Sequence, residues 1–351
     1  MHIFDYSFLK NDLLPAQLVS LASNISTLKV MSAFRKKENE TAFRKLEDAA
    51  KIESIKASNA IEGIVTTDQR VRAIAGGSAP LNHTEAEIAG YRDVLSEVHV
   101  NFAAHDFRES DIRAFHAQMM RLANPLTDGS YKTDDNIIAE RMPDGRRVVR
   151  FLPASAAETP EAMRQLVLAY AEARDDAAIN KLLLVPCVIL DFLCIHPFND
   201  GNGRMSRLLT LLLLYRSGYF VGRYISIEKL IADSKETYYD VLQDSSTGWH
   251  EGKNDYLPFV RYMLGIVIAA YREFASRVDV LITRGLSKPE RVREIIRGTT
   301  GQITKAQIME QCPDISQKTV ERALKDLLES GEIRKIGGGR YTSYTWNWEK
   351  E

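Results

Sequence analysis

The residues best suited to chemistry lie together in one short stretch, His196 to Arg207, which reads HPFNDGNGRMSR. It follows an apolar segment that is predicted to be a helix, and its two glycines let successive N–H groups converge into a concave, anion-binding turn. A helix that begins near Gly203 or Arg204 would point its positive end at the same spot. The stretch therefore predicts a phosphate site.

The side chains of this stretch supply groups that phosphate chemistry needs. Arg204 and Arg207 are neighbours on the first helical turn and can bind different phosphates. Asp200 suits Mg²⁺, which takes few protein ligands beside a polyphosphate, and His196 can act as a general base at neutral pH. Each feature alone has an ordinary structural explanation, but their coincidence at compatible spacing favours a nucleotide site.

The stretch resembles, at every defining position, the HxFx(D/E)GNGRxxR signature of the Fic (filamentation induced by cAMP) family. The resemblance covers roughly residues 80 to 275, including the downstream YYDVLQ and DYLPFVRYML segments. Most Fic proteins transfer AMP from ATP to a Ser, Thr or Tyr hydroxyl of a target protein and release pyrophosphate. The resemblance thus implies a protein adenylyltransferase that uses ATP as substrate and Mg²⁺ as cofactor.

The resemblance also implies a role for each residue of the stretch. His196 would deprotonate the target hydroxyl, Asp200 would bind Mg²⁺, and Arg204 and Arg207 would neutralise the β- and γ-phosphates. Phe198 would pack inward, and the backbone of residues 201–203 would form an anion hole. The other implied ATP-binding residues are Gly201, Asn202, Gly203, Met205, Ser206 and, in the adenine pocket, Tyr239, with Tyr238 as its neighbour.

A second motif lies upstream, where residues 58–63 read SNAIEG. Taken alone it is an ordinary helix end, with Ser58 and Glu62 four residues apart and Gly63 as the C-cap. It resembles the inhibitory motif (S/T)xxxE(G/N) of Fic proteins. The resemblance implies that Glu62, itself counted with the ATP site, pairs with Arg207 and autoinhibits the enzyme.

Apolar residues at three- and four-residue spacing dominate the rest of the chain and predict a mainly α fold. One helix is predicted through Leu14 and Leu28, a second from about Ala33 toward Ala60, and a third after an N-cap at Thr84. The segment NIIAERMPDGRRVVRF predicts a β-hairpin around Pro143-Asp144-Gly145. The resemblance makes this hairpin, residues 137–151, the flap that pairs with the target's main chain.

The segment TRGLSKP, residues 283–289, separates the last part of the chain. Beyond it, helix, turn, helix and a glycine-tipped hairpin follow the pattern of a winged helix. We therefore expect an N-terminal helical region with the inhibitory helix at 1–80, a Fic catalytic core at 81–280 and a winged-helix domain at 285–351. DNA binding by residues 285–351 and a protein-docking or dimerisation role both stay open.

The bulk composition excludes few functions. The 351 residues carry a formal net charge of -1, so no global charge points to nucleic acid or to a membrane surface. No signal peptide or membrane span is predicted, and we expect a cytoplasmic protein without membrane association. The three cysteines, Cys187, Cys194 and Cys312, lack metal-ligand spacing, and the first two, on one predicted helix, are expected in the core.

Three classes of function remain after these arguments. The first is autoinhibited adenylylation of a target protein, with self-modification as a possible first product and a homodimer as a possible assembly. The second keeps the nucleotide site but performs another phosphotransfer or de-AMPylation; kinase-type relatives have Lys where Gly203 stands here, which favours AMP transfer. The third is a DNA-binding regulator in which the Fic core senses a nucleotide.

Overall fold

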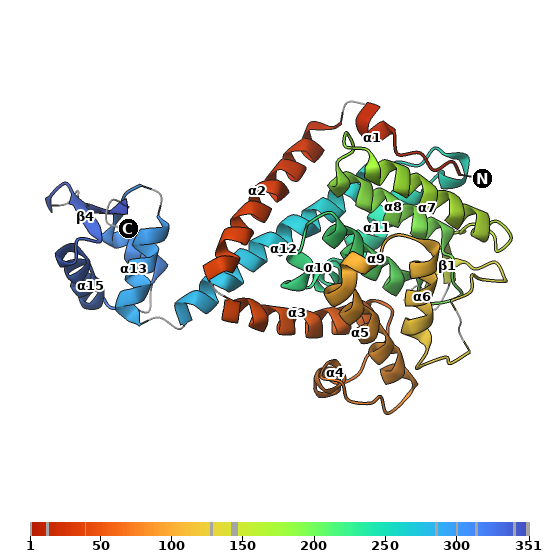
Figure 1. Cartoon of the computed structure of the whole chain (residues 1–351), viewed down its shortest axis with the longest axis horizontal. Coiled ribbons are helices and arrows are strands. Elements are labelled where there is room, and N and C mark those ends of the chain that lie inside the picture. The colour runs from red at the N-terminus through yellow and green to blue at the C-terminus, as the bar shows by residue number, and fades with distance from the viewer. Residues whose placement is uncertain are drawn as a thin grey trace. The chain divides into compact units, whose positions relative to one another are not determined.

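The computed structural model describes residues 2–11, 14–38, 40–126, 129–141, 147–284, 287–299, 301–312, 315–339 and 342–348. The chain forms two compact units, Met1–Ser276 and Arg277–Glu351 (Figure 1). Both are built mainly from helices, as the apolar spacing predicts. The finer division of the first unit at residue 80 stays a prediction.

The first unit is a helical bundle with one hairpin on its surface. Figure 1 shows α8 and α9 in its middle, between α7 and the pair α5 and α6. Its helices are α1 (Phe8–Asn11), α2 (Ala16–Glu38), α3 (Glu40–Ile61), α4 (Asp68–Ala75), α5 (His83–Asn101), η1 (Phe102–Ala104), α6 (Glu109–Met120), α7 (Thr159–Asp175), α8 (Lys181–Ile195), α9 (Asn202–Arg216), η2 (Val221–Arg223), α10 (Ile227–Asp233), α11 (Lys235–Ser246), η3 (Trp249–Glu251) and α12 (Leu257–Arg284), the last of which runs into the second unit.

The helices α8 and α9 form the centre of this core, and both are buried around almost their whole circumference. Every residue of α8 after Lys181 is buried, and so is every residue of α9 from Arg204 to Tyr215. Cys187 and Cys194 lie on α8 and are buried free thiols, as expected. The turn between these two helices therefore has a rigid support on both sides.

Two helix boundaries differ from the predictions. The second predicted helix was to start near Ala33, but α2 continues to Glu38 and α3 begins at Glu40. The sequence RKKENE, residues 35–40, contains no glycine or proline that would mark this boundary. Asn82, not Thr84, is the N-cap of α5, and its side-chain oxygen accepts a hydrogen bond from the Glu85 N–H at 2.9 Å.

The β-hairpin is present where the sequence predicts it. The strands β1 (Ile138–Arg141) and β2 (Arg147–Phe151) pair antiparallel, with Ala139 opposite Val149 and a register shift after Ile138. The predicted tip, Pro143-Asp144-Gly145, lies outside the described residues. The hairpin stands at the edge of the first unit, beside α6 in Figure 1.

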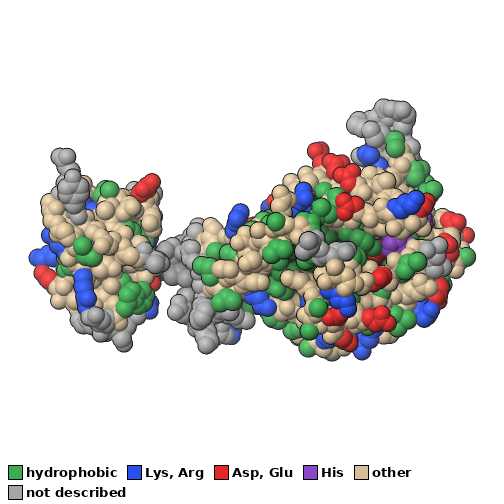
Figure 2. All heavy atoms as spheres, turned by 90° about the horizontal axis from the view of Figure 1, so that it is seen from above, with side chains coloured by type: hydrophobic (Ala, Val, Ile, Leu, Met, Phe, Trp, Pro, Cys, Tyr) green, Lys and Arg blue, Asp and Glu red, His purple; other side chains and the backbone are tan. Residues whose placement is uncertain are grey.

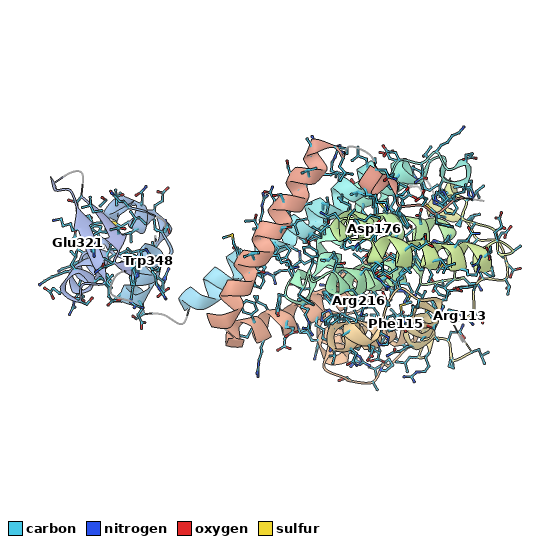
Figure 3. The ribbon with its side chains drawn as sticks, turned by 45° about the horizontal axis from the view of Figure 1, so that its top comes forward. Arg113, Phe115, Asp176, Arg216, Glu321 and Trp348 are labelled. Atoms are coloured by element: carbon cyan, nitrogen blue, oxygen red, sulfur yellow. The ribbon has the colours of Figure 1, made fainter. Side chains whose placement is uncertain are left out.

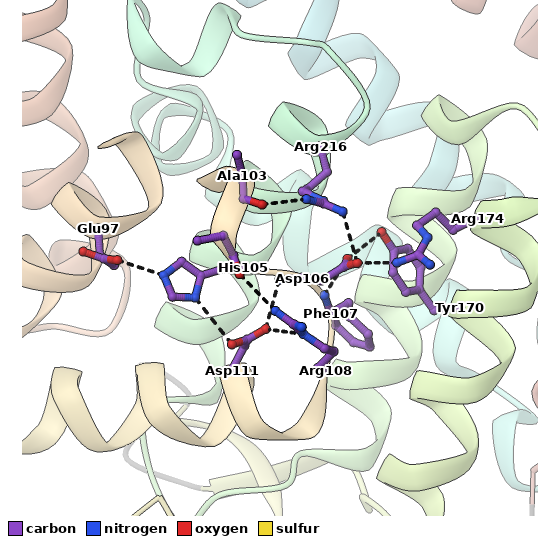
Figure 4. Close-up of polar contacts among 11 residues, drawn as sticks. Glu97, Ala103, His105, Asp106, Phe107, Arg108, Asp111, Tyr170, Arg174 and Arg216 are labelled. Carbon is purple, nitrogen blue, oxygen red and sulfur yellow. Dashed lines mark hydrogen bonds and ion pairs between the residues drawn. The ribbon is translucent and has the colours of Figure 1, made fainter. Parts of the chain in front are cut away.

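A polar cluster holds the start of α6, the helix that packs against α5 and α9. The Asp106 carboxylate accepts hydrogen bonds from Arg174, from Arg216 at 3.3 Å and from the Tyr170 hydroxyl at 3.4 Å (Figure 4). A few residues further on, Phe115 of α6 is 2% exposed and points into the unit (Figure 3). Asp106 thus joins the ends of α6, α7 and α9.

The second unit has its own sheet and its own core. Its elements are α13 (Lys288–Gly298), β3 (Ile303–Thr304), α14 (Lys305–Gln311), α15 (Gln317–Glu329), β4 (Ile333–Ile336) and β5 (Ser343–Trp346), with the strands in the order β3-β5-β4. Val292, Ile308, Val320 and Trp346 are buried in its core. The winged-helix interpretation and the binding of DNA or protein by this unit stay predictions.

The surface carries no dominant charge on the face that Figure 2 shows. Basic and acidic side chains are interspersed with apolar ones over the first unit, in keeping with the net charge of -1. None of the helices in the described ranges combines the length and the apolar character that crossing a bilayer requires.

The closest helix crossing yields a stability prediction. A Cβ on Gly90 of α5 would lie 1.8 Å from the Met119 carbonyl oxygen of α6, which is main chain and has little freedom to move. We expect Gly90→Ala to destabilise the first unit by about 3 kcal/mol, measured by calorimetric unfolding. The matched control is Gly265→Ala in α12, where the Cβ meets no atom within 4 Å. It should leave the stability unchanged or raise it by up to about 1 kcal/mol; equal effects of the two substitutions would contradict the close approach.

Candidate active site

The functional turn begins at His196, which ends α8 in the left-handed conformation with φ 51° and ψ 61°. Among the described residues it alone has a positive φ without being a glycine. Such a conformation is disfavoured for a side chain with a Cβ and persists only where the surroundings enforce it. The position of the imidazole is therefore imposed by the fold.

Lys132 and Asn136, which precede the hairpin, hold this turn from outside. The Lys132 ammonium donates to the Ile195 carbonyl at 3.1 Å and to the Asn136 side chain at 2.7 Å. The Asn136 amide donates to the carbonyls of His196 at 3.3 Å and Phe198 at 3.1 Å. Sequence reasoning missed both residues because a single Lys or Asn in a polar segment carries no sign that it is turned inward.

Asn202 holds the same turn from inside. Its side-chain oxygen accepts from the Phe198 N–H at 2.9 Å, and its amide donates to the Phe198 carbonyl at 2.7 Å. Phe198 is fully buried and stacks on the ring of His116 at 3.7 Å, while the His116 Nε2 lies 3.0 Å from the Asp200 carbonyl. The side chain of Asn202 is thus used within the turn, and only its backbone N–H is left for a ligand.

The N-terminus of α9 lies directly after this turn. Gly201 is the N-cap with φ 83°, and the first hydrogen bond of the helix runs from the Met205 N–H to the Gly201 carbonyl at 2.8 Å. The helix starts at Asn202, one residue earlier than expected. The N–H groups of its first turn have no acceptor within the helix and carry its positive dipole end. This is the geometry of an anion site.

Arg207 lies one turn into α9 and is bound to the upstream motif. Its Nη2 donates to the Glu62 carboxylate at 2.8 Å and to the Ser58 carbonyl at 2.9 Å, and its Nε donates to the Ser58 hydroxyl at 2.8 Å. Burial by itself would lower the pKa of Arg207, but the Glu62 carboxylate, together with Tyr238 and Tyr91, outweighs it and the pKa stands above its ordinary value. The structure thus brings Ser58, Glu62 and Arg207 together.

Two glycines make this contact possible. Gly63 has φ 80° and ends α3 directly after Glu62, a backbone conformation that favours glycine. A Cβ on Gly203 would lie 2.3 Å from the Glu62 carboxylate oxygen. The carboxylate therefore rests on the bare backbone of Gly203, at the anion site itself.

Arg204 faces a different pair of carboxylates. It is only 1% exposed, and its Nη2 lies 3.2 Å from both Glu87 and Asp200. Its Nε and Nη1 are buried without a hydrogen-bond partner. The Asp200 side chain is 68% exposed, and its other oxygen accepts from the Gly201 N–H at 2.6 Å. Glu87 was not predicted as a site residue.

The remaining predicted residues differ in exposure. Met205 and Ser206 are buried, and the Ser206 hydroxyl donates to the Gly203 carbonyl at 2.8 Å, so neither side chain faces a ligand. Tyr239 on α11 is 42% exposed, whereas Tyr238 is buried. Burial raises the pKa of Tyr238, and the nearby Arg207 charge opposes this shift.

His196 is neutral at physiological pH. Burial lowers its pKa to about 4, and the positive charge of Lys132 acts in the same direction, while the Leu193 carbonyl and Glu62 oppose it. Its Nδ1 lies 3.3 Å from the Leu193 carbonyl oxygen. Since a carbonyl only accepts, the proton of the neutral ring lies on Nδ1 and the lone pair on Nε2. The ring can accept a proton through Nε2.

Comparisons with known proteins agree with this geometry. The sequence model of the Fic/DOC family matches residues 106–214; these residues therefore form a Fic/DOC domain. The chain is 26% identical to "Protein adenylyltransferase Fic" of Nematostella vectensis over 219 residues, which are 59% of this chain and 44% of that protein. It is 24% identical to the Drosophila melanogaster protein of the same name over 316 residues, 84% of this chain and 54% of that one. The chain thus spans about half the length of the curated relatives it matches.

Solved structures share the fold. A Fic family protein from Desulfovibrio desulfuricans G20 aligns over 96% of this chain and 97% of its own, with a TM-score of 0.63 and 24% identity. Fic-1 from C. elegans (residues 134–508) aligns over 74% of this chain and 71% of its own, with a TM-score of 0.55 and 23% identity. The expected mainly α, Fic-type architecture is confirmed.

The hydrogen bonds from Asn202 to the His196 turn yield a second prediction. Asn202→Ala removes both hydrogen bonds to Phe198 and leaves a buried backbone N–H without an acceptor, so we expect a loss of about 2 kcal/mol in unfolding free energy, measured by calorimetry. The control is Asn101→Ala, because Asn101 is exposed and its side chain bonds only to Glu97. It should change the stability by less than about 0.5 kcal/mol. An unaltered Asn202→Ala protein would show that the turn is held by other groups.

Proposed function

We propose that this protein is a protein adenylyltransferase that transfers AMP from ATP to a Ser, Thr or Tyr hydroxyl of a target protein. The observation that carries the proposal is the neutral imidazole of His196, held in the turn that leads into α9, the helix that carries Arg207. A base and an anion site at this spacing suit nucleotidyl transfer. The names of the curated relatives support the same activity.

In the proposed reaction, the target hydroxyl gives its proton to Nε2 of His196. Its oxygen attacks the α-phosphorus of ATP, the bond from that phosphorus to the bridging oxygen of the β-phosphate breaks, and pyrophosphate leaves. The backbone N–H groups at the start of α9 stabilise the charge that develops on the phosphoryl oxygens. Arg207 binds the γ-phosphate, and Arg204 supplies a second positive charge that neutralises the β-phosphate.

A divalent cation fits the residues present. Within the described ranges no three His, Cys, Asp or Glu side chains gather closely enough to hold a metal on their own. Mg²⁺ needs no such cage, because one carboxylate and the substrate phosphates usually suffice. Asp200, with its largely exposed carboxylate, is the residue that would hold Mg²⁺. When bound, the ion would offset negative charge on the phosphates.

Glu62 acts as the brake in this proposal. Its carboxylate forms an ion pair with the Arg207 guanidinium, the group that would otherwise bind the γ-phosphate. A carboxylate 4 Å from a phosphate charge opposes it by about 4 kcal/mol at an effective dielectric near 20. ATP that still binds would hold its α-phosphate away from in-line attack, so the rate falls more than the affinity.

The hairpin is the proposed docking place for the target. The edge of a short sheet can add an extended peptide through main-chain hydrogen bonds. Val148 and Val149 of β2 are 39% and 51% exposed and can contact its side chains. Because such pairing recognises backbone more than sequence, the chain itself is among the possible substrates.

Release of the brake is the primary test. Glu62→Gly should raise AMP transfer at least about ten-fold, measured as an AMP-sized increase in intact mass after incubation with Mg²⁺-ATP and as retention of α-phosphate label. His196→Ala in the Glu62→Gly protein should abolish the transfer. Glu161→Gln, which breaks an exposed ion pair with Arg164, is the control and should change nothing. Retention of γ-phosphate label instead would establish phosphate transfer and refute the proposal.

The pH dependence tests the role of His196. A base must be deprotonated, and the pKa of His196 is lowered to about 4, so the ring stays active until the pH falls close to that value. The Glu62 charge raises this pKa, so its removal shifts it further down. We expect the kcat/KM of Glu62→Gly to stay flat from about pH 8 to about pH 6 and to decline only below about pH 5. A decline centred near the ordinary histidine value, about pH 6.5, would mean that His196 is not held neutral.

A further inference from the structure

Three residues of α3 and its end form a polar row toward the core. Ser54, Ser58 and Glu62 are each four residues apart and therefore lie above one another on one helix face. Ser54 and Ser58 are fully buried, whereas the Glu62 side chain is 33% exposed. Ser58 and Glu62 bind Arg207, but Ser54 binds another charged group.

That group is Glu228, a carboxylate that the proposed reaction does not use. It is 0% exposed at the start of α10. It accepts hydrogen bonds from the hydroxyls of Ser54 at 2.7 Å, Tyr91 at 3.0 Å and Ser226 at 3.2 Å. Among the described residues, its hydrogen-bond donors are all neutral. A buried carboxylate without a cation is costly unless a positive charge lies nearby.

Tyr91 of α5 joins this carboxylate to Arg207. Burial raises the pKa of Tyr91 well above its ordinary value and Glu228 raises it further, whereas the Arg207 charge and the Ser58 side chain act in the opposite direction. Arg207 in turn donates to the Ser58 hydroxyl at 2.8 Å. Arg207 thus donates to Ser58 and Tyr91 donates to Glu228, while Tyr91 lies close enough to Arg207 for that charge to act on it.

We propose that Glu228 is the fixed counter-charge of Arg207 and, through Tyr91 and Ser58, holds the guanidinium at the phosphate site whether or not Glu62 is in contact. Arg207 then has two carboxylates of different kinds. Glu62 is partly exposed, contacts Arg207 directly and sits at the end of a helix. Glu228 is enclosed and acts through two hydroxyl groups.

The consequence concerns the state that follows release of the brake. Without Glu228, loss of the Glu62 contact would leave Arg207 as an uncompensated cation, 3% exposed inside the core. With Glu228 in place, the guanidinium keeps its charge balance and its orientation, and its freed N–H groups face the γ-phosphate. Glu228 and Tyr91 are thus positioning residues for ATP. The inference rests on the proposed nucleotide site.

The test compares ATP and AMP binding by the Glu62→Gly protein with and without Tyr91→Phe, using isothermal titration calorimetry in Mg²⁺ buffer. Tyr91→Phe removes one oxygen and keeps the ring, so it breaks the link to Glu228 with little change of volume. We expect ATP affinity to fall about ten-fold. AMP affinity should stay within about two-fold, because AMP lacks the phosphates that reach Arg207.

The matched control is Tyr6→Phe in the same background. The Tyr6 hydroxyl also donates to a fully buried carboxylate, that of Asp191 at 2.7 Å, but this pair is not connected to Arg207. The control should leave the ratio of ATP to AMP affinity unchanged. A purely structural role for Tyr91 predicts the same behaviour for both variants, or an equal loss for both nucleotides, and either result overturns the inference.

The outcomes also separate this inference from the proposed function. If Glu62→Gly alone binds ATP no more tightly than AMP, the phosphate site is wrong and this inference falls with it. If it prefers ATP and Tyr91→Phe leaves that preference intact, only the role of Glu228 is refuted. Should Tyr91→Phe fail to fold, Glu228→Gln, which keeps the shape and removes the charge, replaces it with the same two expected results.

Discussion

The burial of one cation governs the organisation of this site. The Arg207 guanidinium is 3% exposed, and a charge in that position must be compensated by the protein around it. The end of α3 provides a carboxylate, a hydroxyl and a carbonyl for this purpose. The N-terminal helices are therefore part of the site although the Fic/DOC match begins only at residue 106.

In this site, several side chains hold the turn in place, whereas backbone N–H groups are left to bind a ligand. Asn202, Lys132 and Asn136 spend their hydrogen bonds on the carbonyl and N–H groups of residues 195–198. Little of their capacity remains for a substrate. The groups that do not hold the turn are the imidazole Nε2, the backbone N–H groups of the first turn of α9 and the Arg207 guanidinium, which binds Ser58 and Glu62 instead. Such an arrangement places a few ligand-binding groups precisely and offers a ligand few other contacts.

Much of the site could be predicted from the sequence because its signals are local. The apolar run, the left-handed glycine and the arginine spacing occur within a few residues, and they led directly to a turn between two buried helices. The contact of Glu62 with Arg207 spans 145 residues and was available only through the family motif. Lys132, Asn136, Glu87 and Glu228 were missed, since nothing in the neighbouring sequence shows that a polar residue is enclosed. The boundary between α2 and α3 was predicted several residues too early, because no glycine or proline marks it.

The hydrogen bonds from Lys132 and Asn136 to the His196 turn also bear on how a substrate would be recognised. Asn136 lies two residues before β1 and bonds to the His196 carbonyl at 3.3 Å, so the proposed docking edge and the proposed base are held by the same residue. A peptide aligned on that edge would meet an imidazole whose aim does not depend on loop closure. Selectivity would then depend on the distance between the peptide's bound backbone and its hydroxyl group. Many sequences can satisfy such a distance.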